Sequence, residues 1–173
     1  MPKPVTSAVL TAFALFAFAS SAQAGSDTTV NVTLWDKGAD AEMASDHGIG
    51  MTGGKMPATM GIKLSQRKVK AGEVTFEVSN TSKDSIHEMV VLPYKDGEKI
   101  PYVKDELRID EEAAGHLGEV SELDPGQTGA LRIALKPGKY ALVCNIPGHY
   151  MNGMWAILTV EKGPASITTS QGS

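Results

Sequence analysis

Four residues in two parts of the chain carry side chains that bind soft or borderline metal ions. Cys144, His149 and Met154 follow one another at regular spacing, and a Pro-Gly pair between the first two predicts a tight loop. One loop would thus deliver a thiolate, an imidazole and a thioether. His87, in an upstream segment, is the natural source of a second imidazole. Two imidazoles and one thiolate can form a trigonal plane, with a weak methionine ligand on its axis.

This set of donors favours copper. Thiolate and thioether are soft ligands suited to Cu(I), whereas imidazole suits both Cu(I) and Cu(II). Taken singly, each residue could be an ordinary buried cysteine, surface histidine or core methionine, but the joint pattern favours a copper site. Met151 competes with Met154 for the axial position. It lies only two residues after His149, which makes simultaneous coordination difficult, so Met154 is the expected ligand.

The elements that position these residues are predicted to be short strands. Apolar and polar residues alternate in most of them, and Pro-Gly turns separate several of them, which indicates an all-β sandwich or barrel. Alternation in the penultimate strand places Tyr140, Leu142 and Cys144 on one face, directed toward the core. One helical or irregular insertion is expected at residues 103–114. The predicted strands cover residues 28–35, 61–65, 73–79, 85–92, 115–123, 128–135, 139–144 and 155–161.

With His87 upstream of Cys144, His149 and Met154, the chain resembles the cupredoxin family, the small blue type 1 copper proteins such as plastocyanin, azurin and rusticyanin. The resemblance covers residues 61–161. It implies a Greek-key β-sandwich, one copper ion and outer-sphere electron transfer. It also implies that the two histidines and the cysteine are equatorial ligands and that the methionine is axial. By the same resemblance, Asn80 would tie the two ligand loops together.

The beginning of the chain is typical of a secretory signal. Lys3 precedes an apolar run at residues 9–19, and Ala22 to Ala24 form a small-x-small cleavage signature. The run is too short to span a bilayer. We therefore expect cleavage near Ala24, a periplasmic or secreted product, and no membrane insertion of the mature chain.

The expected domain organisation has four parts. Residues 1–24 are the signal, 25–60 hold a strand and a segment rich in methionine and glycine, 61–162 form the copper domain, and 163–173 are a polar tail. The methionine-rich segment is open to two interpretations: a second site for Cu(I), or a loop whose side chains pack on the sandwich. The candidate ligands of the second site are Met43, His47, Met51, Met56 and Met60.

Composition excludes several classes of protein. A single cysteine among 173 residues allows neither an intramolecular disulfide nor a zinc site with several thiolates. The net charge of −4 does not indicate the overall positive charge that is typical of nucleic-acid-binding proteins. Four histidines without a His-x-His motif do not suffice for a multicopper oxidase, and a nitrite reductase would need a second domain.

The leading functional hypothesis is therefore an electron carrier and not an enzyme, because protein ligands would leave the metal no open position. A redox partner, either a cytochrome or a copper enzyme, is expected to dock where His149 emerges between apolar neighbours. The acidic run at residues 110–112 could steer a basic partner. The alternative is a copper trafficking or resistance protein that uses the methionine-rich segment.

Overall fold

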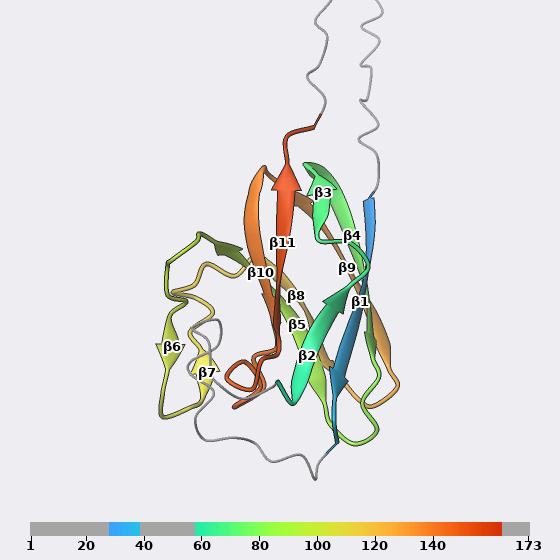
Figure 1. The fold of residues 1–173 in the computed structure, drawn as a ribbon, viewed down its shortest axis with the longest axis vertical. Helices are drawn as coiled ribbons and strands as arrows, with labels where there is room; N and C mark the ends of the chain where they lie inside the picture. The colour runs from blue at the N-terminus through green and yellow to red at the C-terminus, as the bar shows by residue number, and fades with distance from the viewer. Residues whose placement is uncertain (1–27, 39–57, 164–173) are drawn as a thin grey trace, which may run out of the picture.

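The computed structural model describes residues 28–38 and 58–163, which form two facing sheets and a small two-stranded ribbon (Figure 1). In order along the chain, the strands are β1 (Thr28–Asp36), β2 (Met60–Leu64), β3 (Lys68–Lys70), β4 (Gly72–Asn80), β5 (His87–Tyr94), β6 (Tyr102–Val103), β7 (Arg108–Ile109), β8 (Gly118–Leu123), β9 (Thr128–Leu135), β10 (Gly138–Val143) and β11 (Trp155–Glu161). The all-β sandwich predicted from the sequence is confirmed.

The two sheets have different strand orders. The first runs β2-β1-β4-β9, with β1 parallel to β4 and antiparallel to β2. The second runs β3-β11-β10-β5-β8, with β10 antiparallel to both β5 and β11. Because β1 lies between β2 and β4, the strand assigned from the sequence to segment 25–60 is an integral part of the sandwich.

The main core fills the space between the sheets. In β1 and β4, alternate side chains point inward and are fully buried, among them Val30, Leu34 and Phe76. They meet Leu142 and Leu158 from β10 and β11 of the opposite sheet. Burial of apolar surface on this scale is the main favourable contribution to folding. It holds the two sheets, and therefore the residues at their ends, in fixed relation.

A second apolar cluster lies on the other face of β5 and β10. Val90 and Leu92 of β5 contact Ala141 and Val143 of β10, and all four are fully buried. Residues between β5 and β8, including Ile109, cover this face, and Figure 1 shows β6 and β7 beside the sheet. This cover explains why the sequence of β5 is apolar on both faces.

All eight strands predicted from the sequence are present, two of them with the predicted bounds and the others with bounds that shift by one to three residues. The alternation did not predict β3, β6 or β7, which are only two or three residues long. The insertion expected at residues 103–114 is irregular: it contains β7 and several turns. No helix among the described residues is long and apolar enough to cross a membrane. The expected signal sequence and most of the methionine-rich segment and polar tail lie outside these residues.

Candidate metal centre

The pairing of β5 with β10 brings two of the predicted ligands to one end of the sandwich. His87 is the first residue of β5, and Cys144 directly follows β10. The strands are antiparallel, and Val143 lies opposite Val90, so the start of β5 lies beside the end of β10. Both side chains are fully buried, as expected for residues that face the core.

Three potential ligand atoms converge at this end. Nδ1 of His87 lies 3.2 Å from Nδ1 of His149, and Sγ of Cys144 lies 3.4 Å from the same His149 atom. One nitrogen or sulfur atom from each residue falls within 4.8 Å of those of the other two, so this group could hold a metal ion. His149 is partly exposed, whereas His87 and Cys144 are not.

The loop from Cys144 to Met154 is closed by its own backbone. The N–H of His149 donates to Ile146 O (2.9 Å), that of Met154 donates to His149 O (3.1 Å), and that of Cys144 donates to Met154 O (3.0 Å). Gly153 has a φ of +98°, a conformation that glycine adopts without strain. The loop therefore returns the chain to Met154 directly beside Cys144.

The two candidate axial methionines have different surroundings. Met154 is fully buried in the main core cluster, which also contains Cys144. Met151 is partly exposed on the loop. Met154 thus lies beside Cys144 in the core, and its role as the axial ligand stays a prediction.

Burial sets the protonation of the metal-free site. It raises the pKa of the Cys144 thiol to about 12. Burial also lowers the pKa of His149 to about 4, helped by the nearby His87. Burial lowers the pKa of His87 as well, and the adjacent Asp36 offsets this effect only in part. At neutral pH the site therefore holds a thiol and two neutral imidazoles, and a metal ion that binds thiolate must displace a proton.

Asp36, the last residue of β1, contacts His87 from the opposite sheet. Its Oδ2 lies 2.7 Å from Nε2 of His87, and the two side chains are 5 % and 0 % exposed. Burial by itself would raise the pKa of Asp36. Hydrogen bonds from Ser82, His87 and Gly38 outweigh this effect, so that its pKa lies below the ordinary value. Sequence inspection did not single out Asp36, because an acidic residue at a strand end usually faces solvent.

Glu88 and Asn145 tie the two ligand segments together. The Glu88 N–H points at Cys144 Sγ (3.5 Å), and the Asn145 N–H donates to Glu88 Oε1 (3.0 Å). Burial raises the pKa of Glu88 to about 7, with further contributions from Glu111 and Glu119. In the sequence, the sign that Glu88 has a structural role is that this carboxylate precedes a run of apolar residues in a predicted strand.

The side chain of Asn145 also attaches the insertion to the ligand loop. Its Oδ1 accepts the Ile109 N–H (2.6 Å), and its Nδ2 donates to Ile109 O (3.0 Å) and to Glu111 Oε1 (2.7 Å). The Gly148 N–H adds a bond to Leu107 O (2.8 Å). Part of the acidic run at residues 110–112 is therefore engaged in structural contacts.

The role expected for Asn80 is wrong. Its Nδ2 donates to Ser85 O (2.9 Å) and Leu123 O (2.8 Å), and its Oδ1 accepts the Ser82 N–H (2.9 Å). Asn80 thus fastens the β4–β5 connection to the end of β8. The link between the ligand segments is made by Glu88 and Asn145 instead, because they flank the ligands directly.

Of the candidate second-site residues, the structure describes only Met60, which begins β2 and is buried in the main core. Met43, His47, Met51 and Met56 lie outside the described residues. The chain that leads into β2 nevertheless lies close to the ligand loop. A Cβ added at Gly153 would come within 2.7 Å of Ala58 Cβ.

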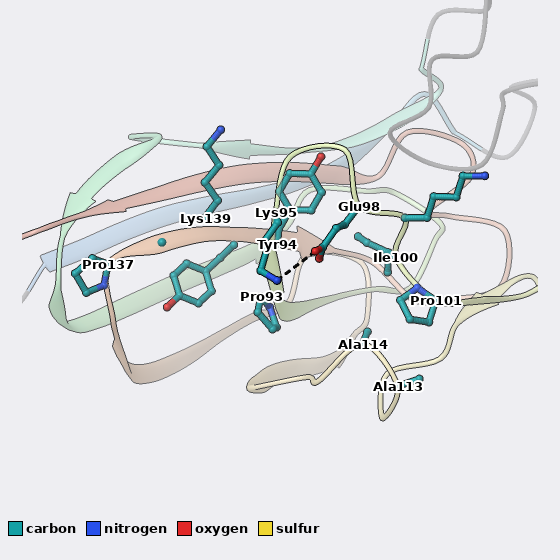
Figure 2. A pocket seen from close by; sticks show the side chains of 13 residues that line it. Pro93, Tyr94, Lys95, Glu98, Ile100, Pro101, Ala113, Ala114, Pro137 and Lys139 are labelled. Atoms are coloured by element: carbon teal, nitrogen blue, oxygen red, sulfur yellow. Dashed lines mark hydrogen bonds and ion pairs between the residues drawn. The ribbon is translucent and has the colours of Figure 1, made fainter.

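An open hollow lies away from this centre, at the opposite ends of β5 and β10 (Figure 2). Its lining includes Tyr94, at the end of β5, and Lys139, near the start of β10. Lys95 and Glu98 form an ion pair across its rim (3.2 Å). The hollow is therefore separate from His87 and Cys144, which are fully buried at the other end of these strands.

Residues 8–157 match the family model of the cupredoxin-like domain. The chain belongs to the cupredoxin family. The resemblance inferred from His87, Cys144, His149 and Met154 is thereby confirmed at the level of the family. No curated protein matches this cupredoxin in sequence.

Solved structures support the same fold. Rusticyanin from Thiobacillus ferrooxidans is 16 % identical over 79 % of this cupredoxin and 79 % of that chain, with a TM-score of 0.51. A structure of reduced rusticyanin is 18 % identical over 79 % and 81 % of the two chains, with a TM-score of 0.52. Reduced auracyanin from Roseiflexus castenholzii is 16 % identical over 81 % of this cupredoxin and 100 % of that chain, with a TM-score of 0.44. The likeness in fold rests on the two rusticyanin structures.

Proposed function

We propose that this cupredoxin binds one copper ion through His87, Cys144, His149 and Met154 and carries single electrons. The observation that carries the proposal is the convergence of two neutral imidazoles and one thiol at a buried end of the sandwich. Two imidazoles, one thiolate and a weak axial thioether are the ligand set of blue copper electron-transfer sites. Rusticyanin, which has a similar fold, is described as a copper protein.

The surrounding residues favour electron transfer with little movement. His87 is fixed by Asp36, and Cys144 is held through Glu88 and through its backbone bond to Met154. Bound copper supplies a one-electron couple between Cu(I) and Cu(II). Because strands and packed loops position the donors, the protein can hold them in nearly the same places in both oxidation states.

His149 is the proposed point of electron exit. It is the only partly exposed member of the three converging residues, and exposed Pro147 and half-buried Ile146 precede it in the same loop. A partner protein, such as a cytochrome or a copper enzyme, would dock at this end. Within the acidic run, exposed Asp110 and Glu112 could add electrostatic attraction to a basic partner.

The proposed role is that of a carrier and not an enzyme. Four protein ligands leave no position for a substrate, and the hollow at the other end of β5 and β10 is separate from the ligands. Export to the periplasm or beyond, after cleavage near Ala24, would place the carrier where soluble redox proteins exchange electrons. Residues 25–60, 61–162 and 163–173 would then form the mature chain.

Redox cycling at constant copper content tests this proposal. The mature protein, loaded with one equivalent of Cu(II), is reduced and reoxidised while bound copper is measured. A reversible one-electron change with copper retained supports a carrier. Release of copper to an added Cu(I) chelator or acceptor protein on each reduction would contradict it and favour trafficking.

A further inference from the structure

The hydrogen bond between Asp36 and His87 joins one predicted ligand to a strand that supplies no ligand. Asp36 ends β1 in the first sheet, whereas His87 begins β5 in the second. Their side chains meet at 2.7 Å, and both are almost completely excluded from solvent. The second carboxylate oxygen, Oδ1, accepts the Gly38 N–H at 2.7 Å. The carboxylate is therefore held from both sides and cannot rotate freely.

This contact decides which nitrogen of His87 can bind a metal. A neutral imidazole carries one N–H and one lone pair. When Nε2–H donates to the Asp36 carboxylate, the lone pair is on Nδ1, which faces His149 at 3.2 Å. Histidine ligands of metals commonly donate their other N–H to a carboxylate, which fixes the tautomer and makes the ligand more basic.

We propose that Asp36 is a positioning residue that fixes the Nδ1 tautomer of His87 and lowers the reduction potential of the centre. The inference rests on the proposed function and extends it to a residue of the N-terminal strand. A buried negative charge next to a ligand favours the more positively charged oxidation state, because little solvent screens it. Asp36 would thus stabilise Cu(II) relative to Cu(I).

Two substitutions separate the hydrogen bond from its charge. Asp36→Asn keeps the shape and leaves an amide oxygen that can still accept from Nε2, but it removes the charge. Asp36→Ala removes both. Asp84→Asn is the matched control, because Asp84 also acts on His87 through its charge but is exposed, and its Oδ1 accepts hydrogen bonds from the hydroxyls of Ser82 (3.4 Å) and Ser85 (3.3 Å).

We expect Cu(II) to bind at least tenfold more weakly to the Asp36→Ala protein, in the range seen when such outer carboxylates are removed. If Cu(I) affinity is unchanged, a tenfold loss raises the potential by about 59 mV for a one-electron couple. Asp36→Asn should also raise the potential, and Asp84→Asn should leave it close to wild type. Unchanged potentials in both Asp36 variants, or equal shifts in Asp36→Asn and Asp84→Asn, would overturn the proposal.

A second measurement does not need copper. Nitrogen-15 NMR of the metal-free protein should show His87 protonated at Nε2 in the wild type and a mixture of tautomers in Asp36→Ala. A wild-type His87 protonated at Nδ1 would also overturn the assignment. If the tautomer and its dependence on Asp36 are found but no copper is bound, the proposed function fails and the positioning of His87 by Asp36 stands.

Discussion

At the scale of residues, the spacing of the sequence predicted three residues that the structure brings together, but not the side chains that hold them. Cys144, His149 and the upstream His87 could be selected because three donor types combine into one known coordination pattern. Asp36 and Glu88 could not, because Asp36 is buried where β1 of one sheet meets β5 of the other, and Glu88 is buried beside Asn145 and the insertion. These surroundings come from contacts between elements far apart in the sequence, which alternation within one strand does not specify.

A test of the axial ligand belongs at this scale. Met154→Gln replaces a buried thioether by an oxygen donor, which favours Cu(II), so we expect copper to be retained and the potential to fall. Each tenfold change in relative affinity corresponds to about 59 mV. Met151→Gln is the control, since Met151 is partly exposed, and it should change little. Voltammetry of both proteins decides: a shift with Met151→Gln and none with Met154→Gln would reverse the assignment.

At the scale of elements, the sequence predicted the long strands and an insertion near residues 103–114, but not the short strands β6 and β7 or the face that the insertion covers. Strands such as β4 and β9 alternate clearly, because one face is buried in β4 and half-buried in most of β9, while the other face is more exposed. The apolar outer face of β5 indicated further cover but could not show what provides it. The cover is the insertion before β8. Hydrogen bonds between Asn145 and Ile109 attach it, and no repeating pattern of apolar residues announces such bonds in the sequence.

Removal of the Asn145 side chain should therefore detach the insertion from the ligand loop. Asn145→Ala leaves the buried N–H and C=O of Ile109 without their partner, which costs about 1–3 kcal/mol for each unsatisfied group. Denaturant unfolding of the metal-free protein measures this loss. Asn31→Ala, at an exposed position of β1, serves as control and should stay within about 0.5 kcal/mol of wild type. Equal stability of the two variants would show that Asn145 does not anchor the insertion.

At the scale of the whole molecule, the two packed sheets bring the predicted ligands to one end of the sandwich. His87 and Cys144 come from neighbouring strands, His149 and Met154 from the loop between β10 and β11, and Asp36 from the facing sheet. A metal bound there connects both ligand segments. Binding to the native state alone must therefore stabilise the entire fold.

Thermal unfolding tests this consequence. At a free copper concentration about 1,000 times the dissociation constant, binding contributes about 4 kcal/mol. For a domain of this size that raises Tm by roughly 8–16 °C. His149→Ala should lose most of the increase. A Tm that does not respond to copper would contradict binding within the fold.

The visible absorption spectrum of the copper-loaded protein tests the central claim most directly, because the bond between a cysteine thiolate and Cu(II) gives an intense charge-transfer band. The wild type should be strongly blue or green, with one Cu(II) per chain. Cys144→Ser, which exchanges soft sulfur for hard oxygen with a small change in volume, should fold but lose the band. A colourless wild-type Cu(II) complex, or a Cys144→Ser protein with the same intense band, would contradict a copper centre built on Cys144.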